Sequence, residues 1–451
     1  MKKNQIITAE ITDITNEGNG VCRFDGMAVF VPETALGDTA EIKIVKVLKN
    51  YAFGIVNKII NPSPDRIVSD CPLFPKCGGC SFRHISYESE LKIKEKFIFD
   101  SFTRLGKLNP EFLPITGCDS PDRYRNKAQY PVSQINGDPI CGFFAKRSHR
   151  IIPGSDCRLL PEVFSDIAQT VTEYMKTNHI LPYNETEGSG LIRHIYIRQA
   201  PATGEIMVCL IVKRSCADKL LELCTELEKK FPEIKTIVMN VNPDNTNVIL
   251  GKKTINLLGN GKITDILCAN NISIAPEAFY QINSPQAEKL YRKAEEFCQL
   301  KGNETLIDLY CGAGTIGLSM ASKIKKLIGV EIIPQAVENA KENAVRSSIH
   351  NAEFICADAG QAAAKLTLKG IKPDIVILDP PRKGCDSSAI DAVSKMSPDK
   401  IIMISCNPST AARDCSLFEQ KGYVTRKVQP FDLFPRTVHV ETVVLMSRVE
   451  K

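Results

Sequence analysis

Two ionisable residues near the C-terminal end of the sequence could carry nucleophilic and acid–base chemistry. Cys406 stands in SCNP directly after the apolar run KIIMI, and Pro408 ends that run, so we expect its thiol at a strand end. A thiol with an ordinary pKa near ~8.5 is already a strong nucleophile at neutral pH. Glu441 lies in the apolar strand HVETVVL, where burial should raise its pKa and make it a candidate base. Taken alone, Cys406 could be a structural cysteine and Glu441 a paired surface carboxylate. Because both are expected on the same sheet, their combination favours a catalytic role.

Three cysteines close together in the sequence predict a metal or cluster site. Cys71, Cys77 and Cys80 have the spacing C-x5-C-x2-C in CPLFPKCGGC, where two glycines let the backbone fold back and the thiolates point inward. Soft thiolates select zinc or iron–sulfur clusters, and because zinc ribbons use two short C-x2-C pairs, this triplet favours iron–sulfur. Three ordinary buried cysteines are the competing interpretation. The candidates for a distant fourth ligand are, in order, Cys157, Cys141 and Cys118.

A glycine-rich segment after the predicted strand TLIDL indicates a site for a nucleotide-like ligand. The segment YCGAGTIG fits the pattern G-x-G-x-x-G, with Gly312 and Gly314 as its first two glycines, which let the backbone approach a ligand. Glu331, 19 residues after Gly312, ends the next strand, where a carboxylate can bind ribose hydroxyls. Asp358 ends the third strand, where it could accept a hydrogen bond from an adenine amine, and Asp379 opens DPPRKG after the fourth, between cofactor and substrate. Each aspartate could also be only a helix cap.

The elements that must position these residues predict an α/β fold with three domains. From about residue 275 onward, apolar strand-like runs alternate with helices, which indicates a Rossmann-like, doubly wound and mostly parallel sheet with ligands at its carboxyl ends. We expect this catalytic domain over 271–451. Residues 1–60 show short β segments broken by turn signals, which predicts a small five-stranded, OB-fold-like barrel. Residues 61–270 form a β-rich central domain with the cysteines, and its amphipathic helix 88–105 could pack on the catalytic domain.

Charge and composition narrow the class of protein and of partner. Lys and Arg total 57 against 52 Asp and Glu, and a net charge of +5 is too small to prove a polyanionic partner. Between residues 121 and 158, however, cations alternate with aromatic residues, which favours contact with RNA phosphates and bases; a solvated basic sheet face is the alternative. We expect a cytoplasmic monomer without membrane contact, because the sequence has neither an export signal nor a membrane-length apolar run. The cations are Arg123, Arg125, Lys127, Lys146, Arg147, Arg150 and Arg158, and the aromatic residues are Tyr124, Tyr130, Phe143 and Phe144.

These motifs and their order resemble the RNA 5-methyluridine methyltransferase family, most closely the TRAM-containing, iron–sulfur 23S rRNA (uracil-5-)-methyltransferases. The N-terminal barrel resembles a TRAM domain, and CPLFPKCGGC with Cys157 resembles a four-cysteine [4Fe-4S] site. The segments FYQIN, DLYCGAGTIGL, GVE, DPPRKG, SCNP and HVETVVL follow in the family's order. The sequence departs from the family at Tyr310, where Phe is common, and at Thr315, where some members carry Asn.

The resemblance implies an enzyme that uses S-adenosylmethionine to methylate uridine C5 in RNA, with 23S rRNA as the expected substrate and a [4Fe-4S] cluster. Cys406 would add to uracil C6 and make C5 nucleophilic, Glu441 would remove the C5 proton, and Asp379 would orient the extruded uracil. The cluster would stabilise the fold or position RNA. The residues implied to contact S-adenosylmethionine are Gln281, Tyr310, Gly312, Gly314, Glu331, Asp358 and Asp379.

Four other functions stay open from the sequence. A tRNA uridine C5 methyltransferase would carry the same catalytic motifs, and a non-catalytic RNA-binding or folding factor would not need Cys406. An oxidoreductase that uses NAD would share the glycine-rich segment but would give no role to the later Cys and Glu. An amino-group methyltransferase carries a D/N-P-P motif followed by an aromatic residue, whereas here Arg382 follows.

Overall fold

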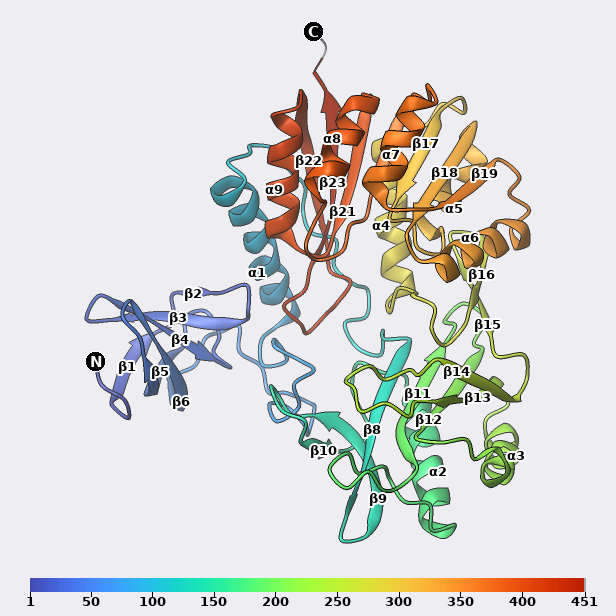
Figure 1. Cartoon of the computed structure of the whole chain (residues 1–451). Helices are drawn as coiled ribbons and strands as arrows, with labels where there is room; N and C mark the ends of the chain where they lie inside the picture. Colours follow the sequence, from blue (N-terminus) through green and yellow to red (C-terminus); the bar gives the residue numbers. More distant parts are fainter. Residues whose placement is uncertain (450–451) are drawn as a thin grey trace.

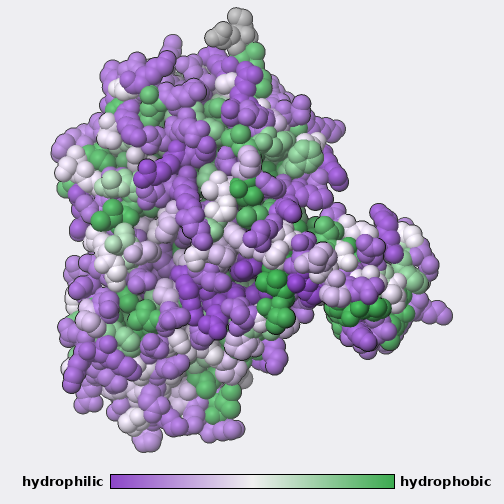
Figure 2. Space-filling view, turned by 180° about the vertical axis from the view of Figure 1, so that it is seen from behind, coloured by the Kyte–Doolittle hydropathy of each residue, from purple (hydrophilic) through white to green (hydrophobic). Residues whose placement is uncertain are grey.

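The computed structural model describes residues 1–449, and its N-terminal strands form a six-stranded sheet in the order β1-β5-β6-β4-β3-β2 (Figure 1). The sequence predicts five strands; the sixth is the two-residue β2. In β5, Ile42 and Ile44 are fully buried while Lys43 is exposed, but a bulge between Ile44 and Lys46 ends this alternation. Seen from behind, this sheet forms a knob beside the main body (Figure 2). The strands are β1 (Ile6–Glu10), β2 (Asp13–Ile14), β3 (Asn19–Phe24), β4 (Met27–Pro32), β5 (Thr39–Val47) and β6 (Tyr51–Asn61).

The predicted amphipathic helix links the N-terminal sheet to the C-terminal part of the chain. Helix α1 (Tyr87–Asp100) continues as a π-helical turn, η1 (Ser101–Leu105). Its Ile93 and Phe97 pack into the core of the N-terminal sheet, whereas Ile98 and Phe102 pack into the core around the C-terminal sheet. The helix therefore belongs to both cores, which a helical period alone cannot reveal.

The middle of the chain forms a seven-stranded sheet, β10-β9-β8-β11-β12-β13-β14, in which only β12 and β13 pair in parallel. Every residue of β12 is buried, and two helices pack against the sheet. The elements are β8 (Lys127–Ile135), β9 (Asp138–Phe144), β10 (Ile151–Pro153), α2 (Glu162–Thr177), β11 (Ile192–Gln199), β12 (Ile206–Val212), η2 (Ala217–Lys219), α3 (Leu221–Lys230), β13 (Ile234–Val241) and β14 (Lys253–Leu258).

The C-terminal sheet has eight strands in the order β19-β18-β17-β20-β21-β23-β22-β7 and is the predicted Rossmann-like sheet. Strands β19, β18, β17, β20 and β21 run parallel to one another, and β23 pairs antiparallel with both of its neighbours. The elements are α4 (Ser284–Cys298), β17 (Thr305–Leu309), α5 (Thr315–Met320), η3 (Ala321–Lys323), β18 (Lys326–Glu331), α6 (Pro334–Arg346), β19 (Ala352–Cys356), α7 (Ala359–Leu368), β20 (Ile375–Leu378), α8 (Ser387–Met396), β21 (Lys400–Ser405), α9 (Pro408–Glu419), β22 (Tyr423–Phe431) and β23 (Glu441–Arg448).

Two short elements cross the boundaries that the sequence predicts. Strand β7 (Glu111–Phe112) pairs with β22 at the edge of the C-terminal sheet, although it lies within 61–270. The 270/271 boundary falls inside the hairpin of β15 (Ile263–Leu267) and β16 (Asn270–Ile274), whose buried residues pack into a core of the C-terminal sheet. Within residues 1–449, no helix combines the length and the apolar character needed to span a membrane.

Candidate active site

A cavity of about 1190 Å³ opens at the carboxyl ends of β17, β18, β20 and β21. The chain runs from β17 outward to β18 and β19 and then returns to β20 on the other side of β17. This reversal is the topological switch point at which open α/β sheets bind ligands. Eight of the residues predicted from the sequence line this cavity: Gln281, Tyr310, Gly312, Glu331, Asp358, Asp379, Cys406 and Glu441.

The glycine-rich turn after β17 brings the backbone into the cavity. Tyr310 and Gly312 have φ values of 65° and 55°, in the left-handed region that a tyrosine rarely adopts. The turn is held by Glu331, whose carboxylate accepts hydrogen bonds from Gly312 N at 3.1 Å and from Ile333 N at 2.8 Å. Gly314 does not line the cavity: it precedes α5 at φ 80°, and a Cβ there would meet neighbouring side chains at 3.1 Å. The left-handed φ and the close neighbours together favour glycine at this position.

Two further predicted residues combine a structural contact with a place in the lining. Asp358 caps α7, because its Oδ1 accepts a hydrogen bond from Gln361 N at 3.1 Å. The alternative that this aspartate is a helix cap is therefore correct as far as this contact is concerned. It lines the cavity as well. The Gln281 carbonyl accepts from Asn126 Nδ2 at 2.8 Å, which ties the central sheet to the cavity wall.

Cys406 and Glu441 stand next to each other across two antiparallel strands. Ser405, at the end of β21, pairs with Thr442 of β23, so one further step of this register sets Cys406 beside Glu441. Asn407 caps α9 by accepting from Ser409 N at 3.1 Å, which fixes the backbone just after the cysteine. The pair of side chains predicted to act together is therefore brought together by the sheet.

Burial changes the acid–base properties of these groups. It raises the pKa of Asp379 to about 7. Burial, reinforced by the nearby Asp379 carboxylate, raises the pKa of Glu441 to about 8, whereas Arg382 lowers it. Burial also raises the pKa of the Cys406 thiol to about 11, with Glu441 adding to the rise and Arg382 opposing it. Arg382 thus favours the thiolate of Cys406 and the carboxylate of Glu441.

A second cavity, of about 560 Å³, reaches Cys406 from another side. It lies between the turn Asn16–Asn19 of the N-terminal sheet, the β9–β10 hairpin, and the loop after β21. Cys406 and Arg382 are the two residues that line both cavities. The thiol can therefore meet two ligands that arrive by different routes.

The structure locates the basic residues of the central sheet differently from the sequence-based expectation. Tyr124 and Tyr130 are buried and cannot stack on bases. Arg123 and Arg158 form ion pairs, and burial lowers the pKa of Lys127 to about 8. The exposed cations instead lie at the tip of the β9–β10 hairpin, where the first two line the second cavity: Lys146, Arg147 and Arg150.

The four predicted cysteine ligands line one cavity of about 260 Å³, together with Arg83 and Arg125. The second and third choices for the fourth ligand do not: Cys141 is buried in the core of the central sheet, and Cys118 contacts Asn283 elsewhere. Within residues 1–449, no three Cys, His, Asp or Glu side chains are close enough to hold one metal ion. The cysteines of this cavity are Cys71, Cys77, Cys80 and Cys157.

Among the lining residues to which the sequence assigned no role, three bear on the chemistry of the cavity. Arg382 stands three residues after Asp379 in DPPRKG, next to Lys383, so two adjacent cations in a strand-end motif were the available signal. Phe279, within FYQIN, is 74% exposed at the cavity, and an aromatic side chain so open to solvent is unusual. Phe434 has no comparable signal, because it lies in an irregular loop before β23.

Comparison with known proteins agrees with this geometry. Residues 86–449 match the family described as tRNA (Uracil-5-)-methyltransferase, and residues 2–56 match the TRAM domain. An uncharacterized RNA methyltransferase of Bacillus cereus is 42% identical, and the match covers all of this chain and 98% of that protein. An uncharacterized RNA methyltransferase of Clostridium tetani is 41% identical, and the match covers 99% of this chain and 97% of that protein. The crystal structure of Pyrococcus abyssi tRNA (uracil-54, C5)-methyltransferase with S-adenosyl-L-homocysteine superposes with a TM-score of 0.77, at 23% identity, over 98% of this chain and all of that one.

The Rossmann-like sheet, the TRAM sheet and the strand-end cavity define a nucleic-acid methyltransferase. The chain belongs to the tRNA (uracil-5-)-methyltransferase family. It is an RNA (uracil-5-)-methyltransferase, which methylates uracil C5 in RNA with S-adenosylmethionine as methyl donor. The predictions of fold class and enzyme class are confirmed, and the oxidoreductase, amino-group methyltransferase and non-catalytic interpretations are wrong.

Proposed function

We propose that Cys406 is the nucleophile and Glu441 the base of this reaction, and that the substrate is 23S rRNA. The observation that supports these two catalytic roles is that Cys406 and Glu441 lie next to each other where β21 ends and β23 begins, in the cavity that Asp379 and Arg382 also line.

The strand-end cavity fits S-adenosylmethionine. Its volume exceeds the ~300–1,000 Å³ usual for small-molecule sites, so a nucleoside and a second reactant can share it. Glu331 would bind the ribose hydroxyls and Asp358 the adenine amine, while Gln281 and Asp379 would lie near the methyl group. When bound, this donor supplies an electrophilic methyl group. The backbone of Tyr310 and Gly312 forms the adjacent wall.

Cys406 would start the reaction by forming a carbon–sulfur bond to C6 of an extruded uracil. The thiol must first lose its proton to solvent, which reaches Cys406 through either cavity, and Arg382 is the cation that stabilises the resulting thiolate. The electron pair of the C5–C6 double bond moves into the ring as an enolate, so C5 becomes nucleophilic and can take the methyl group. Asp379 would hold the uracil while this happens.

Glu441 would complete the reaction by taking the C5 proton. The C–H electrons re-form the C5–C6 double bond and expel the Cys406 thiolate, so the enzyme is regenerated. Burial makes the ionised Glu441 carboxylate a stronger base than one in water.

The second cavity would admit the RNA strand with its extruded base. The TRAM sheet and the exposed hairpin cations border it, and Lys146 and Arg147 can neutralise phosphates on either side of the target nucleotide. The N-terminal sheet and the cysteine cavity favour 23S rRNA, because tRNA-directed bacterial members of the family generally lack both. A second candidate substrate is tRNA, favoured by the similar fold of the archaeal protein whose name specifies tRNA uracil 54.

The cysteine cavity is proposed to hold a [4Fe-4S] cluster. Its donor set fits: four thiols and no carboxylate or imidazole line the cavity, and Arg83, Arg125, Lys127 and Arg158 would offset the charge of four thiolates. The cluster would supply structural cross-linking rather than redox chemistry. Anaerobically purified protein should be brown and should bleach in oxygen; colourless protein with tightly held zinc contradicts the proposal.

Covalent trapping tests the catalytic proposal. With 5-fluorouridine-substituted rRNA fragments and S-adenosylmethionine, the wild-type enzyme should form an adduct that survives denaturing electrophoresis, because fluorine cannot leave as a proton does. Cys406→Ser should form none and should keep its RNA affinity within about 2-fold. Nucleoside analysis of rRNA and tRNA from a deletion strain decides between the two substrates: loss of 5-methyluridine from tRNA alone contradicts the rRNA assignment.

A further inference from the structure

The loop between β22 and β23 contributes different residues to the linings of the two cavities. We call residues 432–440 the connector. Phe434 lines the strand-end cavity, and Val438, His439 and Val440 line the second cavity. Within the connector, the Phe434 and His439 rings lie edge to face at 6.0 Å, and His439 Nε2 is 3.5 Å from an Arg382 nitrogen. Any shift of the connector therefore moves groups on both sides of Cys406.

The connector has no regular secondary structure, so other parts of the molecule must hold it. Four consecutive carbonyl groups accept hydrogen bonds from donors in four different places. These are Leu433 O from Asn283 Nδ2 of the α4 cap at 3.1 Å, Phe434 O from Lys94 Nζ of α1 at 3.2 Å, Pro435 O from Tyr124 OH of the central part at 3.0 Å, and Arg436 O from Ser81 N, next to Cys80, at 2.8 Å.

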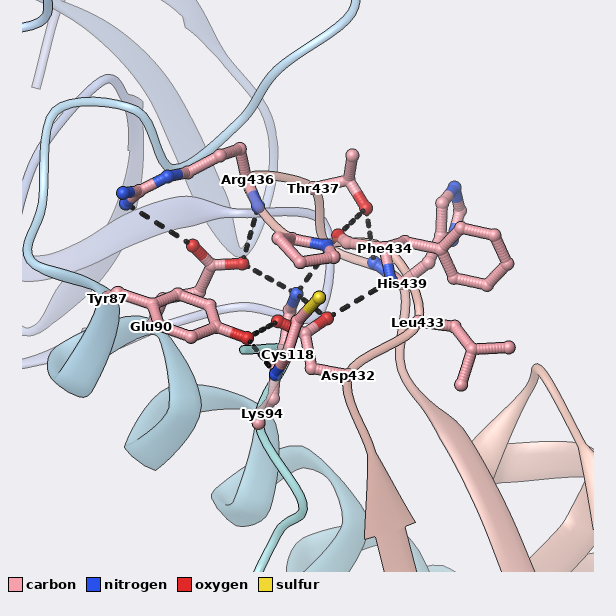
Figure 3. Close-up of polar contacts among 12 residues, drawn as sticks. Tyr87, Glu90, Lys94, Cys118, Asp432, Leu433, Phe434, Arg436, Thr437 and His439 are labelled. Atoms are coloured by element: carbon pink, nitrogen blue, oxygen red, sulfur yellow. Dashed lines mark hydrogen bonds and ion pairs between the residues drawn. The ribbon is translucent and has the colours of Figure 1, made fainter. Parts of the chain in front are cut away.

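A buried ionic network anchors the same segment to α1 (Figure 3). The Lys94 ammonium, with no exposed side-chain surface, donates to Glu90 Oε1 at 2.6 Å and to Asp432 Oδ1 at 2.7 Å. Glu90 Oε1 in turn accepts from Arg436 N at 2.7 Å, and Asp432 Oδ2 accepts from Tyr87 OH at 2.9 Å. Arg436 has a φ of 67°, so the network holds a backbone conformation that arginine alone would rarely adopt.

Such a network is an unusual way to gain stability. Because removing charges from water is costly, well-packed apolar residues often stabilise a core as much as a buried ion pair does. The charged groups instead fix geometry, because the Lys94 ammonium donates to three acceptors and so holds these acceptors in fixed positions relative to one another. Two of these acceptors, Asp432 Oδ1 and Phe434 O, lie on either side of Leu433, and the second belongs to the residue whose ring lines the cavity.

We propose that Lys94 and Tyr124 are positioning residues that fix the connector and hold the Phe434 ring against the entering uracil. This inference rests on the proposed function of Cys406. The ring lines the same cavity as Cys406 and Glu441, and flipped bases are commonly stacked on aromatic side chains. Because Tyr124 belongs to the central part and Lys94 to α1, the reaction cavity acquires its final shape only when these parts are docked on the C-terminal sheet.

Tyr124→Phe is the sharpest variant, because it keeps the ring and removes only the hydroxyl, which donates to Pro435 O and accepts from Arg125 Nε at 3.2 Å. We expect adduct formation with 5-fluorouridine RNA to slow between about 10-fold and 100-fold in single-turnover conditions, while affinity for S-adenosylhomocysteine changes less than about 2-fold. Tyr130→Phe is the matched control: it also removes a buried hydroxyl donor, but the acceptor of that donor, Ser155 O at 3.1 Å, does not belong to the connector. It should lose similar thermal stability and keep the wild-type adduct rate.

A double-mutant cycle separates positioning from general structure. If Tyr124 acts through Phe434, adding Tyr124→Phe to Phe434→Ala should slow the adduct no further than Phe434→Ala alone. Multiplicative losses, or an unchanged rate in Tyr124→Phe, overturn the inference. Lys94→Met should behave as Tyr124→Phe does, with the exposed Lys92→Met as its control, and if it does not fold, the tyrosine cycle decides. Absence of any wild-type adduct would instead refute the role of Cys406.

Discussion

Replacing Glu441 with Gln should raise the free energy of unfolding in alkaline solution and lower the rate of catalytic turnover. Glu441 is 7% exposed and has a pKa of about 8 in the folded protein, against an ordinary value of 4.5. Between these two values the folded state binds the proton more tightly than the unfolded state, so the carboxyl group's contribution to stability is full below about pH 4.5 and falls as the pH rises toward 8.

The size of the effect follows from the same pKa. Each pH unit within the window corresponds to about 1.4 kcal/mol, which sets an upper limit of roughly 5 kcal/mol at pH 8. Water entry into an ionised site reduces this, and we expect Glu441→Gln to gain about 2 kcal/mol over the wild type near pH 8.5, with no difference near pH 5. Gln is neutral at both values and similar in shape, so packing is preserved.

Urea denaturation at the two pH values measures the stability difference, and electrophoresis of reactions on ordinary rRNA measures the catalytic one. Without a base for the C5 proton, Glu441→Gln should accumulate the methylated covalent adduct while turnover falls by about 10²- to 10⁴-fold. Equal stability of the two proteins near pH 8.5 would refute the inference that a buried, easily protonated carboxyl group lies beside Cys406. Normal turnover would refute its role as the base.

Three further predictions use other parts of the site. Binding of S-adenosylmethionine, which carries a sulfonium charge, should lower the pKa of Asp379 and Glu441 and release protons near pH 7.5, whereas S-adenosylhomocysteine, which lacks that charge, should not. Calorimetry in buffers of different ionisation enthalpy measures the proton release, and equal release with both ligands contradicts the prediction. Gly314→Ala should lose about 1–3 kcal/mol of unfolding free energy, because of its left-handed φ and its neighbours at 3.1 Å; an unchanged melting temperature contradicts this. Alanine at both Lys146 and Arg147 should weaken RNA binding and reduce its logarithmic salt slope by about 1.4, without altering donor affinity in calorimetry.

The order of motifs along the chain predicted the catalytic sheet and most of its cavity. Chemistry at strand ends is readable because the residue after a buried apolar run must emerge at the edge of the sheet, as Cys406 and Asp379 do. The cysteine spacing likewise indicated that Cys71, Cys77 and Cys80 would share one cavity, and the first of three candidates for a fourth thiol, Cys157, lines it as well. Each of these features can be recognised from a short segment of the sequence, or from several such segments that belong to one sheet.

What could not be predicted depends on contacts between distant segments. The interleaved aromatics of the central sheet suggested base stacking, but their alternation equally suits a buried face, and Tyr124 and Tyr130 lie there. Lys94 has the sequence environment of an ordinary helical surface lysine; only its contact with Asp432, 338 residues away, makes it a buried ion. Phe434 enters the cavity for the same reason, since its loop is shaped by donors from four other parts of the chain.

The arrangement of the two cavities bears on the order in which the reactants bind. Methyl donor and RNA would approach Cys406 through separate openings whose common wall consists of Cys406 and Arg382. Neither reactant then blocks the other, and the carbon–sulfur bond can form before or after the donor arrives. The connector borders both openings, so a change in its position would affect base entry and methyl transfer together rather than either alone. An enzyme that forms a covalent bond to its substrate gains from this coupling, because the adduct is productive only when the methyl group is already aligned with C5.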